Sequence, residues 1–123
     1  MRRTEGRFDP RPENAAAARD LVRTALRGSK IDAVDAVLLT DELVSNAIRH
    51  AQTEFAVRIE VDDDAICVEV VNHAPDLLPV DRDPSSSGGW GLTMLSTVAD
   101  EWGYARRPDD KCVWFRLFTQ EDR

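Results

Sequence analysis

Two runs of alternating apolar and polar residues place the strongest constraint on how this chain can fold. They are FAVRIEV at residues 55–61 and AICVEVV at residues 65–71. Alternation with a period of two is typical of β-strands that bury one face. Only three aspartates, at residues 62–64, separate the two runs. The pattern therefore predicts a β-hairpin.

Helical patterns stand on both sides of this hairpin. Pro12 precedes an alanine-rich stretch that predicts a helix over residues 13–27, ended by Gly28. Asp32 can cap a second helix over roughly residues 33–51, because its short carboxylate can accept hydrogen bonds from the first free N–H groups.

The C-terminal third predicts one more helix and two more strands. The helix runs from Gly91 to about Asp100, and the strands WGYAR (102–106) and CVWFRLF (112–118) flank an RPDDK turn. The order of elements indicates an α+β fold, in which a mixed, mostly antiparallel sheet carries about three helices on one face in a two-layer sandwich. Residues 72–89, with three prolines, three serines and two glycines, form a long loop, and such loops are often functional.

Length, charge and cysteine content limit the classes of protein to which this chain can belong. The 123 residues fit a single domain, 1–123. The net charge of -7 argues against nucleic-acid binding, which needs clustered positive charge. No run of about 18 apolar residues predicts a membrane span, so we expect a cytoplasmic protein. Cys67 and Cys112 fall within strand patterns and are expected to be reduced, packed thiols.

The stretch DELVSNAIRH, residues 41–50, places unusual polar residues within a helix that is otherwise patterned for burial. Glu42, Asn46 and His50 are spaced by four and share one stripe, with Arg49 beside them. An exposed face of a helix more often carries Lys, Glu and Gln. The stripe is therefore a candidate binding or catalytic face, although two exposed helix residues would account for Glu42 and Asn46 equally well when these are taken alone.

Three segments, in the same order along the chain, resemble the motifs of the GHKL ATPases, the superfamily of the Bergerat ATP-binding fold. ELVSNAIRHA (42–51) resembles the E-x-x-x-N box, VEVVNHAPD (68–76) the strand that ends in D-x-G-x-G, and GGWGL (88–92) the G-x-G before a helix. KCVWFRL (111–117) is similar to the last strand of bacterial anti-sigma serine kinases. The resemblance covers nearly the whole chain.

The resemblance implies ATP and Mg²⁺ as cofactors. Asn46 would supply an amide oxygen to Mg²⁺, a hard ion that prefers oxygen ligands. Glu42 would accept the proton of a substrate serine as general base. The other nucleotide-binding positions implied by the resemblance are Arg49, His50, Asn72, Ala74, Gly89, Gly91, Leu92 and Cys112. Residues 72–89 would form an ATP lid.

The chain departs from the family pattern at residues 72–76. Asn72 stands where the family has an aspartate that accepts a hydrogen bond from the adenine amino group, and Ala74 and Pro75 replace freedom that glycine gives the turn. An amide keeps the acceptor oxygen and loses the charge that strengthens the bond. We expect ATP affinity to fall by about five- to thirtyfold, for a loss of roughly 1 to 2 kcal/mol.

Two functions remain open at this point. The first is an ATP-dependent serine/threonine kinase that acts as an anti-sigma factor, with a sigma factor and a STAS-type antagonist protein as partners. The second is a module of the same fold that binds little nucleotide and sequesters a partner without phosphate transfer. Related kinases often dimerise, so the resemblance implies that this chain could form a homodimer. A sensor histidine kinase, a gyrase-like ATPase or a chaperone ATPase would need further segments that we do not expect in 123 residues.

Overall fold

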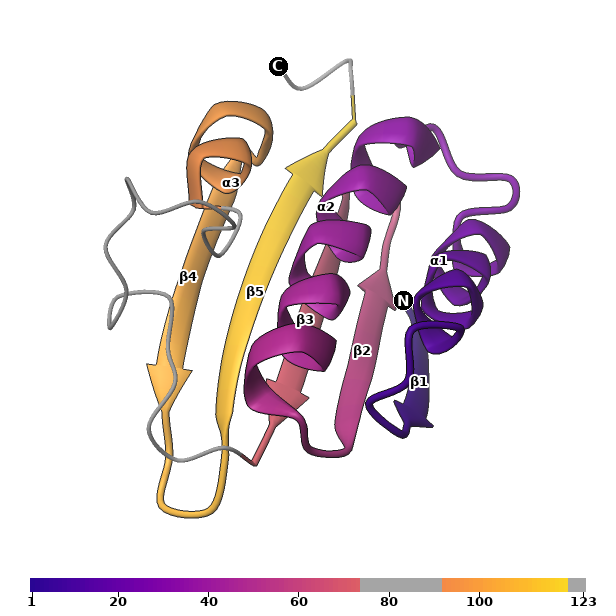
Figure 1. Cartoon of the computed structure of the whole chain (residues 1–123). Helices are drawn as coiled ribbons and strands as arrows, with labels where there is room; N and C mark the ends of the chain where they lie inside the picture. Colours follow the sequence, from indigo (N-terminus) through magenta and orange to yellow (C-terminus); the bar gives the residue numbers. More distant parts are fainter. Residues whose placement is uncertain (74–91, 120–123) are drawn as a thin grey trace.

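The computed structural model describes residues 1–73 and 92–119, which form a five-stranded sheet with helices on one face (Figure 1). The strands are β1 (Arg2–Phe8), β2 (Phe55–Val61), β3 (Ala65–Asn72), β4 (Glu101–Arg106) and β5 (Lys111–Phe118). The helices are α1 (Asn14–Ala25), α2 (Ala33–Asn46), the π-helix η1 (Ala47–Ala51) and α3 (Leu92–Val98). The predicted α+β class is confirmed.

The sheet has the strand order β1-β2-β3-β5-β4, and all four neighbouring pairs are antiparallel. The sheet is therefore antiparallel throughout its described strands, whereas the sequence analysis expected a mixed one. The hairpin of β2 and β3 and the hairpin of β4 and β5 both form as predicted. Strand β3 lies at the centre of the sheet, so it is flanked by backbone partners on both sides.

The first strand was missed by the sequence analysis. Residues 2–8 pair with β2 over seven positions, from Arg2 opposite Val61 to Phe8 opposite Phe55. The segment RRTEGRF carries one large apolar residue, Phe8, whose ring stacks on Phe55 with centroids 5.4 Å apart. Its strand conformation comes from this pairing with β2 rather than from an apolar pattern of its own.

The two main helices begin and end near the predicted positions. Asp32 caps α2, since its carboxylate accepts from the backbone N–H of Val34 at 2.9 Å and of Asp35 at 3.4 Å. Gly28, which follows the last turn of α1, has a φ of 80°, a conformation that glycine adopts without strain. The predicted helix over residues 33–51 is present as α2 followed directly by η1.

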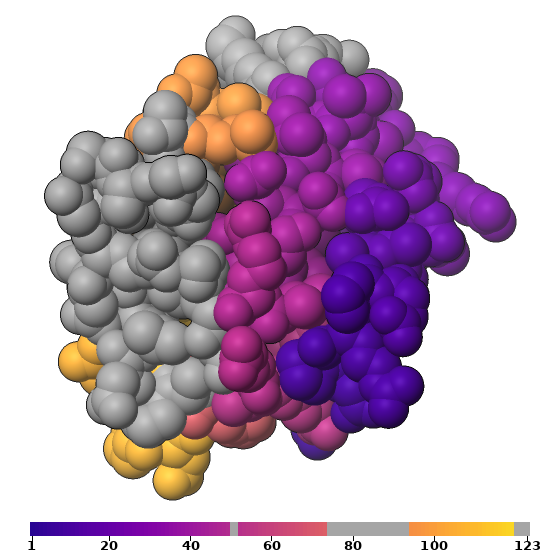
Figure 2. Space-filling view, viewed as in Figure 1, coloured from indigo at the N-terminus to yellow at the C-terminus, as the bar shows by residue number. Residues whose placement is uncertain are grey.

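Helices α1 and α2 pack against each other and cover the sheet, α1 on β1 and β2 and α2 on β3 and β5. In Figure 2, α1 and α2 form much of this face of the molecule, in indigo and purple. The core between the layers includes Leu39, Val44, Val57, Val68 and Phe115, each at most 1% exposed. No helix among the described residues is long and apolar enough to cross a membrane.

Candidate functional site

The polar stripe of the second helix lies where α2 passes into η1. Asn46, the last residue of α2, is 1% exposed, Glu42 is partly buried one turn earlier, and Arg49 is exposed. Short π-helical segments are rare and are frequently found at functional sites. Here the segment ends at Gln52, whose φ of 55° is left-handed and whose N–H donates to the carbonyl of Ala47.

Asn46 has an unusual set of hydrogen bonds for a buried amide. Its Oδ1 accepts from Nη2 of Arg49 at 2.9 Å. Its Nδ2 is buried and has no hydrogen-bond partner among the described residues. Buried polar atoms are nearly always hydrogen-bonded, so an orphan donor of this kind indicates a place for a ligand or water. The guanidinium also shows that the amide oxygen can hold a cationic partner.

The sheet brings two more buried polar side chains to the same end of the molecule. Asn72, the last residue of β3, is 6% exposed, and Lys111, the first residue of β5, is 1% exposed. The two are directly opposite in the antiparallel ladder. Because alternate residues of a strand share a face, Asn72 lies on the face of buried Val70 and Lys111 on the face of buried Val113. Both core residues belong to the layer covered by helices.

The end of β3 is held in place from two sides. The backbone N–H of His73 donates to Oγ1 of Thr53 at 3.3 Å, and Nδ1 of His73 lies 3.2 Å from the carbonyl oxygen of Asp109. These contacts join the segment after η1 and the turn between β4 and β5 to the residue that follows Asn72. In Figure 1 the C-terminal end of α2 and η1 lie over this end of β3, and η1 packs against β3. Asn46, Asn72 and Lys111 thus gather at one end of the sandwich.

The structure does not bring Cys112 to this face. Cys112 is opposite Val71 in β3 and so lies on the other face of the sheet from Asn72. Glu69, on the same face as Val71, forms an ion pair with Arg58. Burial raises the pKa of the Cys112 thiol, and the nearby Glu69 carboxylate raises this pKa further. Lys111 occupies the position on the helix side.

The sequence contained a signal for Lys111 that the sequence analysis did not use. Val113, Phe115 and Leu117 are the apolar residues by which β5 joins the core on the helix side, and counting back by two from them gives residue 111. Cys112 belongs to the alternate set of residues, which faces the other side of the sheet. Both cysteines are free, as expected, and Cys67, like Cys112, lies on the face of the sheet away from the helices.

Ala74, Gly89 and Gly91 lie outside the described residues, as does the expected ATP lid beyond residue 73. His50 belongs to η1 and Leu92 to α3.

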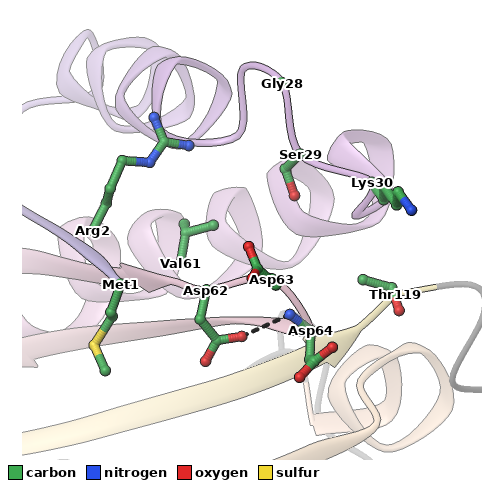
Figure 3. A pocket seen from close by; sticks show the side chains of 10 residues that line it. All are labelled: Met1, Arg2, Gly28, Ser29, Lys30, Val61, Asp62, Asp63, Asp64 and Thr119. Atoms are coloured by element: carbon green, nitrogen blue, oxygen red, sulfur yellow. Dashed lines mark hydrogen bonds between the residues drawn. The ribbon is translucent and has the colours of Figure 1, made fainter.

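A separate cavity lies at the opposite end of the sandwich. It has a volume of about 530 Å³ and is lined by Met1, Arg2, the segment Gly28–Lys30, Val61, the turn Asp62–Asp64 and Thr119 (Figure 3). Within the turn, Oδ1 of Asp62 accepts from the backbone N–H of Asp64 at 2.8 Å. None of the residues that the sequence analysis selected for a site lines this cavity.

The antiparallel sheet, the buried asparagine at the end of α2 and the polar strand end beneath it agree with an ATPase domain of the GHKL type. The histidine kinase-like ATPase domain family matches residues 8–117, and the chain belongs to that family.

Two solved structures share the fold. The crystal structure of the RsbU and RsbW domains of Rv1364c from Mycobacterium tuberculosis superposes with a TM-score of 0.71 at 17% identity, over 95% of this chain and 32% of that one. The histidine kinase AdeS of Acinetobacter baumannii superposes with a TM-score of 0.58 at 14% identity, over 98% of this chain and 70% of that one. The chain therefore spans about a third of the first structure.

Proposed function

We propose that the chain is an ATP-binding anti-sigma factor with serine/threonine kinase activity toward a STAS-type antagonist protein. The observation that carries this proposal is Asn46, a buried amide one helical turn from Glu42 within a histidine kinase-like ATPase domain. The fold shared with the RsbW-containing structure supports the anti-sigma branch of the family. A sigma factor and its antagonist are the partners that this proposal implies.

Asn46 fits a Mg²⁺ ion that arrives with the nucleotide. Mg²⁺ usually takes only one or two protein oxygens beside water and phosphate oxygens, and a neutral amide oxygen adds no charge to the site. When bound, the ion would neutralise charge on the triphosphate. Arg49 must release the amide oxygen for this to happen, and its guanidinium is then free to pair with phosphate oxygens, because it is exposed and one turn away.

Glu42 would act as the general base. In phosphate transfer, Glu42 would accept the proton of the substrate serine hydroxyl as the serine oxygen bonds to the γ-phosphorus and the bond from that phosphorus to the β,γ-bridging oxygen breaks, leaving ADP. Its partial burial keeps the carboxylate accessible to a protein substrate. A positioned general base contributes about 10² to 10⁴ in rate.

The second candidate, a partner-binding module with little nucleotide chemistry, is favoured by two features of the same site. Asn72 offers a neutral amide where the family has a carboxylate, and Arg49 holds the oxygen that a metal would need. Both features weaken binding of Mg-ATP without altering the fold. The two candidates therefore differ in nucleotide affinity rather than in architecture.

Calorimetric titration with Mg-ATP tests the proposal, using the native chain, Asn46→Ala and Asn72→Asp. We expect weak binding by the native chain, a gain of about five- to thirtyfold in Asn72→Asp, and loss of most affinity in Asn46→Ala. Transfer of labelled γ-phosphate to purified STAS-domain proteins then tests the kinase. If neither the native chain nor Asn72→Asp binds Mg-ATP, the partner-binding module is the better account.

A further inference from the structure

Asn72 and Lys111 form a polar pair of one neutral and one positively charged side chain. The family pattern has a carboxylate at residue 72 instead. Directly opposite residues in an antiparallel pair have Cβ atoms about 4.5 to 5.5 Å apart. On its other side Asn72 is opposite Phe55, which has no polar group. Of the two residues directly opposite Asn72 in the neighbouring strands, Lys111 is the polar one. Both Asn72 and Lys111 are at least nine-tenths buried.

The amide of Asn72 can pair with either kind of purine. This step rests on the proposed function, which places the base of the nucleotide at Asn72. Adenine offers an amino group that donates and an N1 that accepts, whereas a 6-oxopurine offers an O6 that accepts and an N1–H that donates. An asparagine amide has both a carbonyl oxygen and an NH₂ group. By turning over, it can make two hydrogen bonds to either base.

Lys111 favours one kind of purine over the other. Its ammonium has three donors and no acceptor, so beside position 6 of the base it can donate to O6 of a 6-oxopurine but cannot accept from the amino group of adenine. A charged donor makes hydrogen bonds roughly twice as strong as a neutral one. A carboxylate at residue 72 would have the reverse effect, because it would pair with the lysine and accept from the adenine amino group.

We infer that this site prefers 6-oxopurine nucleotides, such as GTP and ITP, over ATP, with Asn72 reading the base edge and Lys111 setting the preference. The two residues come from adjacent strands at the sheet end where Asn46 ends the central helix. The preference arises from this chain's own residues at positions 72 and 111.

Parallel titrations of the full chain with Mg-ITP and Mg-ATP test the inference, because hypoxanthine and adenine differ only at position 6 and in the proton on N1. We expect the native chain to bind ITP about tenfold more tightly than ATP, the ratio that one charge-assisted hydrogen bond supplies. Lys111→Met keeps an unbranched, slightly shorter side chain and removes its donors, so the two nucleotides should then bind within about threefold of each other. Asn72→Asp should prefer ATP by about tenfold or more. Lys30→Met, at the other end of the molecule, is the matched control and should keep the native ratio.

The outcomes separate this inference from the proposed function. If the native chain prefers ATP, or if Lys111→Met keeps the native ratio, the inference is overturned and an ATP-dependent kinase stands. If Asn72→Asp binds ATP and the native chain binds neither nucleotide, the base position is right and the inference falls. If no form binds either nucleotide, both fall. The comparison of Mg-ITP and Mg-ATP binding by the native chain needs no substitution, so it can overturn the inference even if a variant fails to fold.

Discussion

Replacing Arg49 with alanine should lower the stability of the nucleotide-free protein. The substitution removes the 2.9 Å hydrogen bond to Oδ1 of Asn46 and leaves both polar atoms of a 1% exposed amide without a protein partner among the described residues. An unsatisfied buried acceptor costs about 1 to 3 kcal/mol. The substitution also removes the entropy cost of holding the exposed Arg49 side chain in this bond, which is up to about 2 kcal/mol.

The net expectation is a loss of about 1 kcal/mol in the free energy of unfolding, or a fall of roughly 3 to 5 °C in melting temperature for a chain of this length. Thermal unfolding without nucleotide measures it. Arg23→Ala is the matched control, because Arg23 forms an exposed ion pair with Asp20, and such pairs contribute about 0 to 1 kcal/mol.

A double-mutant cycle with Asn46→Ala tests the reason for the change. If the hydrogen bond is its source, Arg49→Ala should cost close to nothing in a chain that already lacks the Asn46 amide. The reasoning is refuted if Arg49→Ala lowers stability equally in both backgrounds, or if it leaves the native melting temperature unchanged.

Three further predictions concern other parts of the molecule. Glu42→Ala should reduce phosphate transfer to an antagonist by about 10² to 10⁴ while leaving the melting temperature and nucleotide affinity nearly unchanged, with Asp41→Asn as the control; a rate within threefold of native contradicts the general-base role. Gly103→Ala should cost about 1 to 3 kcal/mol and alter tryptophan fluorescence, because the new Cβ would lie 2.8 Å from the ring of Trp114. Cys112 should react with iodoacetamide at pH 8 much more slowly than an unfolded-chain thiol, since burial raises its pKa and the thiolate is the reactive form; equal rates would contradict the burial.

The elements that the sequence predicted well are those whose local signals agree with their tertiary contacts. The β2–β3 hairpin has a full period-two pattern on both strands, and Asp32 both begins α2 and caps it. Strand β1 has no comparable signal. Its residues Arg3, Glu5 and Arg7 are exposed, and its position is set by seven register pairs with β2, which a local pattern cannot reveal.

The site was predictable in its motif and not in its contacts. The spacing of Glu42 and Asn46 follows from helix geometry, and the burial of Asn46 agrees with a ligand role. The contact between Arg49 and Asn46 depends on how η1 continues α2, which no residue pattern indicated. Lys111 became visible only when the β3–β5 register placed it opposite Asn72.

The orphan donor of Asn46 bears on how a weakened site could still bind nucleotide. A buried N–H without a partner costs about 1 to 3 kcal/mol, a considerable fraction of the roughly 5 to 15 kcal/mol by which a domain is stable. In the nucleotide-free chain this cost lowers the stability of the fold. A ligand oxygen that accepts from Nδ2 removes the cost, so that this free energy appears as binding affinity. The loss of a carboxylate at residue 72 can therefore be offset in part at residue 46, on the facing layer. Nucleotide binding should for this reason depend more steeply on Asn46 than on Asn72.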